Sequence, residues 1–71
     1  MTTTKHAHIM NAYGFIRAKI NHGDGRVQQI ASSACPDTGY ELCRQAIRDW
    51  ADKHGYTCEL FAGSATLTKQ G

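Results

Sequence analysis

The stretch TGYELCRQAIRDWADKH, residues 38–54, decides the fold, because its apolar residues recur with the period of an α-helix. One side of that helix carries the apolar residues Tyr40, Cys43, Ala46, Ile47, Trp50 and Ala51. The other side carries the charged and amide residues Glu41, Arg44, Gln45, Arg48, Asp49 and Asp52. The sequence therefore predicts one amphipathic helix with a core face and a solvent face, and Trp50 is its largest apolar side chain.

Both ends of this helix have sequence signals. Thr38 and Glu41 match a capping box, in which the hydroxyl and the carboxylate satisfy free amides of the first turn. Pro36 stands just ahead and keeps the helix from starting earlier. Gly55 can adopt the left-handed conformation that ends a helix, and Lys53 places a donor near the last carbonyls. We therefore expect the helix to begin at Thr38 and to end just before Gly55.

Residues before the helix have the pattern of β-strands. Residues 8–20 read as one long strand, and Gly14 marks the place where a strand of this length bends. Residues 21–25 tolerate positive φ and predict a tight turn. A second strand follows over residues 26–34, where the spacing of the apolar residues predicts a bulge near Gln28 and Gln29 that turns Val27 and Ile30 toward the helix.

Residues after the helix read as a second hairpin. Apolar and polar residues alternate over residues 56–62, Gly63 and Ser64 suit a two-residue turn, and a last strand with Leu67 inward covers residues 65–69. The expected fold is α+β in the order β-β-α-β-β. A single helix packs on one face of a four-stranded, mainly antiparallel sheet over residues 8–71, after a flexible N-terminal arm of residues 1–7.

Length and composition limit the class of protein. Seventy-one residues suffice for one domain, and 41 % hydrophobic with 20 % charged residues is typical of a globular chain rather than a disordered one. No apolar run approaches the about 18 residues of a membrane-spanning helix, and the first residues lack the apolar core of a signal peptide. We expect a cytoplasmic protein that does not contact a membrane.

The three cysteines do not form a sequence motif. Cys35, Cys43 and Cys58 are odd in number and none stands in a CxxC pair. Cys43 lies on the apolar helix face and Cys58 in an apolar strand, so we interpret both as small buried side chains. A disulfide between them is geometrically allowed, but a cytosolic setting disfavours it.

Signals for catalysis and for metal binding are weak. The chain has no phosphate-binding glycine motif, no nucleophile elbow and no HExxH. Two histidines, His6 and His8, fall in or directly beside the expected arm, while His22 falls in a turn and His54 at the helix end, where capping explains it. We expect no enzyme activity, no cofactor and no metal site.

One helix covers one sheet face, so the other face is expected to be open. That face should carry Phe15, Arg17, Lys19, Glu59 and Phe61, with Tyr13 near the bend. The net charge is +2, and the basic excess lies in residues 1–36. An exposed face with aromatic and basic residues is where a binding site should be sought. The candidate partner-binding residues are Tyr13, Phe15, Arg17, Lys19, Arg26 and Phe61.

Three kinds of partner fit this face. A protein can bind the aromatic residues and arginine, which are enriched at interfaces. A single-stranded RNA or DNA can stack bases on the aromatics and place phosphates on the cations, although Glu59 opposes it. A second copy of the chain can pair the two open faces as a homodimer.

The order of these elements also resembles a known family. The features that carry the resemblance are the turn at Asp24 and Gly25, the helix opening after Pro36 and Asp37, its end at Gly55, and the turn at Gly63 and Ser64. In this layout the chain resembles small phage-encoded anti-CRISPR proteins, in particular inhibitors of type I, multi-subunit surveillance complexes. The resemblance lies in organisation rather than in a motif, so it assigns no functional residue.

The resemblance implies a non-enzymatic inhibitor that docks on a Cas subunit or complex and blocks target-DNA binding or nuclease recruitment. Many such inhibitors are acidic and mimic DNA. A net charge of +2 departs from that pattern and favours occlusion of a protein surface.

Overall fold

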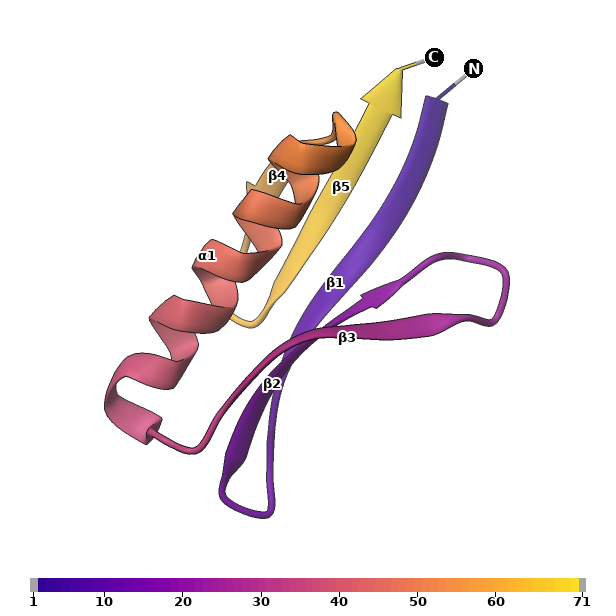
Figure 1. Ribbon diagram of the computed structural model, residues 1–71. Coiled ribbons are helices and arrows are strands. Elements are labelled where there is room, and N and C mark those ends of the chain that lie inside the picture. The colour runs from indigo at the N-terminus through magenta and orange to yellow at the C-terminus, as the bar shows by residue number, and fades with distance from the viewer. Residues whose placement is uncertain (1, 71) are drawn as a thin grey trace.

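In the computed structural model, which describes residues 2–70, one helix lies on one face of a five-stranded antiparallel sheet (Figure 1). The strands are β1 Thr2–Ala12, β2 Phe15–Asn21, β3 Val27–Ser33, β4 Thr57–Leu60 and β5 Ser64–Gln70, and the helix α1 is Pro36–His54. The strand order is β3-β2-β1-β5-β4, so β3 and β4 are the two edges. Because α1 joins these two edge strands, the chain crosses the sheet once on the side that the helix covers.

The α+β class with a single helix is confirmed, but the strand count is five rather than four. The predicted strand over residues 8–20 is two strands, because the chain reverses at Tyr13 and Gly14 instead of bending. Ala12 pairs with Phe15 across this two-residue turn. Both turn residues have positive φ, 55° and 79°, as a type I′ hairpin turn requires. The order of elements is therefore β-β-β-α-β-β.

The beginning of the chain also differs from the expectation. Thr2 to Ala7, expected in a flexible arm, form the first half of β1, and Thr2 pairs with Gln70 of β5. β1 is consequently the central strand of the sheet, with β2 on one side and β5 on the other. Met1, the first residue of the expected arm, and Gly71 lie outside the described residues.

The core lies between α1 and the covered face of the sheet. It consists of the buried residues Ala7, Ile9, Ile16, Ala18, Ile20, Cys43, Ile47, Ala51, Ala65 and Leu67. Trp50 is only partly buried and packs at the rim, where its ring stacks on His54 and meets Tyr56. The aliphatic residues, rather than the tryptophan expected from size, form the centre of the core.

The helix begins earlier than its sequence signals predict. Its first residue is Pro36 and Cys35 occupies the N-cap position, so Thr38 lies inside the first turn and the predicted capping box does not form. Proline suits this first position because its φ is already helical and its missing amide hydrogen would have had no partner. The other end is confirmed: Gly55 has φ 78° and closes the helix after His54.

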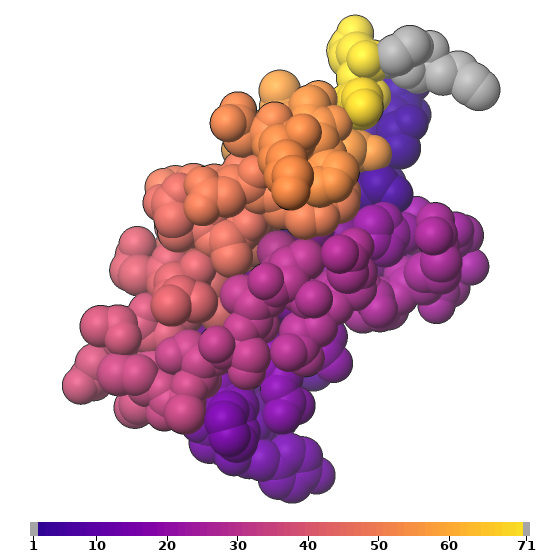
Figure 2. All heavy atoms as spheres, in the orientation of Figure 1, coloured from indigo at the N-terminus to yellow at the C-terminus, as the bar shows by residue number. Residues whose placement is uncertain are grey.

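The hairpin of β2 and β3 follows the prediction closely. His22 N–H donates to the carbonyl of Arg26 at 3.0 Å, and Gly23 and Gly25 both have positive φ in the turn. A bulge occurs in β3, where Ala18 pairs with Ala31 but Lys19 pairs with Gln29, so that Ile30 is the extra residue. Figure 2 shows this hairpin and α1 side by side on the helix side of the molecule.

The bulge turns only one of the two expected side chains toward the core. Ile30 packs against the core, as predicted, whereas Val27 pairs with Asn21 and is exposed. The last hairpin is confirmed with Leu67 fully buried, but its turn lies at Ala62 and Gly63, because Phe61 N–H donates to the Ser64 carbonyl at 2.8 Å.

Candidate interaction surface

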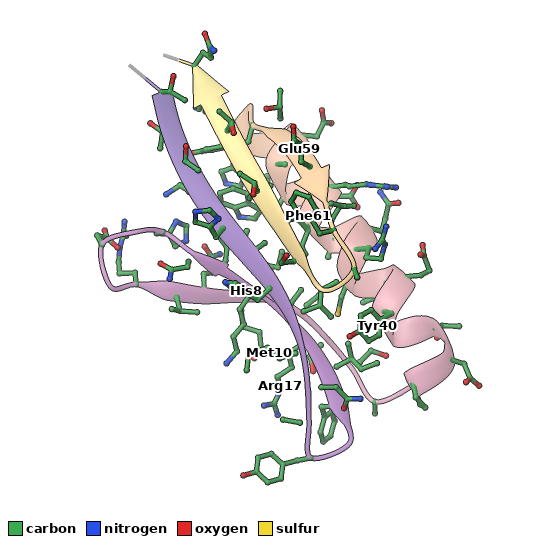
Figure 3. The ribbon with its side chains drawn as sticks, turned by 180° about the vertical axis from the view of Figure 1, so that it is seen from behind. His8, Met10, Arg17, Tyr40, Glu59 and Phe61 are labelled. Carbon is green, nitrogen blue, oxygen red and sulfur yellow. The ribbon has the colours of Figure 1, made fainter. Side chains whose placement is uncertain are left out.

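The sheet face opposite α1, called the open face below, is seen directly in Figure 3. Successive residues of a strand point to opposite sides, and Ala7 and Ile9 of β1 are buried under the helix. His6, His8 and Met10 therefore belong to the open face, and all three are exposed. The other strands add Phe15, Arg17, Lys19 and Asn21 of β2, Val27, Gln29 and Ser32 of β3, Ser64, Thr66 and Thr68 of β5, and Thr57 and Glu59 of β4 to the open face.

The strand register arranges these residues in rows across the sheet. Arg17 lies directly opposite Met10, and Lys19 lies opposite His8. Directly opposed residues of antiparallel strands have neighbouring side chains on the same face. Thr66 opposes His6 on one side and Glu59 on the other. The basic residues are thus gathered over β1 and β2, and the acidic residue lies at the β4 edge.

The end of the β1–β2 hairpin carries a group of four residues, Met10, Tyr13, Phe15 and Arg17, which we call the hairpin patch. The guanidinium carbon of Arg17 lies 5.5 Å from the centre of the Phe15 ring, within the range of a cation–π contact. Met10 is 50 % exposed, Phe15 42 % and Tyr13 95 %. Large apolar side chains thus remain accessible around one pre-positioned arginine.

The charges of the open face are unequal. Among the described strand residues that point there, Arg17 and Lys19 are basic and Glu59 is acidic. Four other acidic residues lie in α1: Asp37, Glu41, Asp49 and Asp52. Because strand order separates β2 from β4 by β1 and β5, Glu59 is three strands away from Arg17, about 14 Å at the usual strand spacing. The region over β1 and β2 therefore favours an anion.

Four of the six candidate residues lie together. Phe15, Arg17 and Lys19 alternate along β2 on the open face, and Tyr13 occupies the adjoining turn. Their placement on one face agrees with the predicted alternation. The structure also adds Met10, which lies opposite Arg17 on β1.

The other two candidates are separate from this group. Arg26 lies in the β2–β3 turn, at the opposite end of β2 from Phe15, about 20 Å away along the strand. Its side chain pairs with Asp24 at 2.8 Å, and the backbone amide of Arg26 helps to hold the pKa of the Asp24 carboxyl below its usual value. Phe61 follows β4 at the far edge and is 54 % exposed, and its carbonyl accepts a hydrogen bond from Arg44 at 3.2 Å.

The expected open face lacks the residues of its central strand: His6, His8 and Met10. His6 falls in the expected flexible arm, His8 where that arm meets the expected long strand, and Met10 within that strand. A signal was present, because residues 6–10 alternate histidine or methionine with Ala7 and Ile9, which is the period of a half-buried strand. It is short, and the strand that pairs with it lies at the other end of the chain.

The other histidines and the cysteines lie outside the open face. His22 Nδ1 is 2.9 Å from Lys5 Nζ, and its Nε2 is 3.0 Å from the Gln28 side-chain oxygen. His54 Nδ1 donates to the carbonyl of Trp50 at 2.8 Å, as a helix-end histidine can. Within residues 2–70, no three His, Cys, Asp or Glu side chains are grouped to hold a metal ion.

All three cysteines are free thiols, including the pair Cys43 and Cys58. Burial raises the pKa of both these thiols. Cys35 differs because it is exposed at the N-cap position, where hydrogen-bonding groups of Thr38 and then the Asp37 amide lower its pKa. Only Cys35 therefore combines exposure with an environment that favours the thiolate.

Comparison with known proteins adds no assignment to this surface. The chain matches no protein-family model, no curated protein and no solved structure. The one helix of the described residues, α1, lacks an apolar stretch long enough to cross a membrane.

Proposed function

We propose that the chain is a non-enzymatic binding protein whose open face docks on an acidic patch of a partner protein. The observation that carries this proposal is the hairpin patch. Arginine, methionine and aromatic residues are the types enriched in the cores of protein–protein interfaces, and arginine and tyrosine dominate their binding energy. Here Arg17 is stacked on Phe15 and flanked by Met10, so its side chain is partly ordered before any partner binds.

Charge complementarity supports an acidic partner surface. Arg17 and Lys19 lie side by side along β2, and Glu59 is at the distant edge of the sheet. Positive potential over β1 and β2 attracts carboxylates and speeds their encounter. The partner's acidic groups would accordingly lie over β1 and β2, with its apolar residues on Met10 and Phe15.

The anti-CRISPR resemblance supplies a specific candidate partner. A type I surveillance complex that is blocked by occlusion of a Cas subunit would contact the open face and leave the outer face of α1 in solvent. The decisive measurement is co-elution of the protein with a purified type I complex on a size-exclusion column. We expect co-elution of the parent protein at micromolar concentration.

A pair of double variants tests the surface. Phe15→Ala with Arg17→Ala removes an exposed aromatic and an arginine from the hairpin patch, and we expect at least a 10-fold weaker association from the loss of two such side chains. The matched control, Leu42→Ala with Arg48→Ala, removes an exposed apolar residue and an arginine from α1 and should bind like the parent. Retained binding by a folded Phe15/Arg17 variant would contradict the assignment.

Two other partners remain as outcomes of the same set of experiments. A labelled oligothymidylate that shifts with the protein at low salt but not at high salt would replace the protein partner by a single-stranded nucleic acid. A dimer in sedimentation at micromolar concentration that the Phe15/Arg17 variant abolishes would replace it by a second copy of the chain.

A further inference from the structure

The central strand of the open face carries two histidines. His6 and His8 flank the buried Ala7 on β1 and point away from the helix, where both are exposed. His8 lies between Lys19 of β2 and Ser64 of β5. The two imidazoles therefore occupy the middle of the surface on which we propose that an acidic partner docks.

The surroundings of these imidazoles are basic or neutral. Facing them from β2 are Lys19, opposite His8, the more distant Arg17, and the neutral Asn21, opposite His6. From β5, Ser64 and Thr66 oppose them, and both are neutral. The acidic residue that faces the same side is Glu59 of β4, which is separated from β1 by β5. No carboxylate among the described residues directly opposes either imidazole across the strand register.

The other two histidines of the chain, unlike His6 and His8, have hydrogen-bond partners. His22 is joined to Lys5 and Gln28 through its two ring nitrogens, and His54 is joined to the Trp50 carbonyl. Within residues 2–70, neither His6 nor His8 has a hydrogen bond or an ion pair of this kind. Their ring nitrogens are free to meet a ligand.

Among the described residues, His6 and His8 are the histidines whose side chains belong to the open face. Histidine is the side chain that ordinarily changes charge between pH 5 and 8. With both imidazoles neutral, Arg17 and Lys19 exceed Glu59 by one positive charge. With both protonated, the excess is three.

We infer that docking of an acidic protein surface on the open face is proton-dependent, and that His6 and His8 on the central strand are the residues that make it so. This inference rests on the proposed function of the open face. An exposed ion pair contributes about 0.2 to 1 kcal/mol, so two imidazolium contacts correspond to a gain of roughly 2- to 30-fold in affinity. The partner should bind more tightly at mildly acidic pH than at mildly alkaline pH.

The test uses a fluorescein-labelled peptide of ten glutamates as the probe for an acidic protein surface. Its carboxylates stay ionised across the chosen range, because glutamate ordinarily titrates near pH 4.3. Fluorescence anisotropy at pH 6.0 and pH 8.0, at equal ionic strength, gives the ratio of the two dissociation constants. We expect tighter binding at pH 6.0 by about 2- to 30-fold.

Two variants test whether His6 and His8 cause the difference in binding between the two pH values. His6→Asn with His8→Asn removes both imidazoles from the open face and should bring the ratio close to one. His54→Asn removes an exposed histidine at the end of α1, outside the open face, and should keep the parent ratio. A circular dichroism melt at each pH verifies that every variant is folded.

The possible results separate the inference from the proposed function. If the peptide binds equally at both pH values, or if the ratio persists in the His6/His8 variant, the inference is wrong while the docking surface stands. If the peptide fails to bind at either pH at low salt, the proposed function is wrong. If an oligothymidylate of equal charge binds and the peptide does not, the partner is a nucleic acid and the protein-docking proposal is overturned.

Discussion

The two faces of the sheet are built from the same strands, but the histidines on them differ in their hydrogen-bond partners. On the covered face three polar side chains have partners: Lys5 and Gln28 contact the two ring nitrogens of His22, and Lys69 donates to the His54 carbonyl at 3.1 Å. On the open face His6 and His8 have no such partners among the described residues. A histidine in this protein therefore has a structural role where α1 covers the sheet, and is available for binding where α1 does not.

Apolar side chains differ between the faces in the same way. Ile20, Ile47 and Leu67 are fully buried between α1 and the sheet, whereas Met10 and Phe15 on the open face are about half exposed. Burial stabilises the fold in the first group. Residues of the second group contribute little to stability and remain available for contacts with a partner. Substitutions on the two faces should consequently separate stability from binding.

The largest expected effect is the truncation of a core residue. Ile47→Ala creates a cavity under the centre of α1 and should lower the free energy of unfolding by about 2 to 5 kcal/mol. This loss is a large part of the total free energy of unfolding of a small domain. Urea denaturation followed by circular dichroism measures the change. Met10→Ala on the open face is the control and should stay within about 0.5 kcal/mol of the parent. Similar losses in both variants would show that the two faces do not divide stability from binding.

A smaller effect is expected at Gly39, where α1 packs tightly against β2 and β3. A Cβ at Gly39 would lie 3.0 Å from Ile16 Cδ1 and 3.2 Å from Ser33 Cβ. Gly39→Ala should therefore destabilise the protein by up to about 2 kcal/mol, since overpacking outweighs the gain of about 1 kcal/mol in helix propensity.

Ile16→Val removes the crowded Cδ1 atom and provides the test of this cause. In the Gly39→Ala background it should cost less stability than it costs in the parent, as a double-mutant cycle from urea denaturation would measure. Additive losses would mean that crowding between Ile16 and Gly39 is not the cause.

The smallest expected effect concerns reactivity rather than stability. Hydrogen bonds from Thr38 and Asp37 lower the pKa of the exposed Cys35 thiol, while burial raises the pKa of Cys43 and Cys58. At pH 7 more of Cys35 is thiolate, so iodoacetamide should modify it first. Mass spectrometry of the peptides over time gives the three rates. Modification of Cys43 as fast as Cys35 would indicate that α1 opens readily from the sheet.

Most local elements could be predicted from the sequence, because their signals lie within a few residues of each other. The apolar period of α1, its end at Gly55 and the turn over residues 21–25 are of this kind. The first hairpin was missed because Tyr13 is an unusual residue at positive φ. Gly14 suggests a bend within one strand, although the buried positions change from odd numbers (Ala7, Ile9) to even numbers (Ile16, Ala18) across it. The helix start was missed because Thr38 and Glu41 form a capping pattern that Pro36 and Cys35 make unnecessary.

The candidate site could be predicted in part for the same reason. Phe15, Arg17 and Lys19 share a face through simple alternation on one strand, which the sequence shows directly. Arg26 and Phe61 depend on where the ends of β2 and β4 lie in the sheet, and the structure separates both from the hairpin patch.

The sequence by itself determined that this chain has one amphipathic helix, polar turns and alternating strands, because periodicity and turn chemistry are local properties. Only the tertiary structure decided that Thr2–Ala12 is the central strand, since its pairing with β5 joins opposite ends of the chain. That pairing places His6, His8 and Met10 beside Lys19 and Arg17. The composition of the open face follows from long-range hydrogen bonding, which no local pattern specifies.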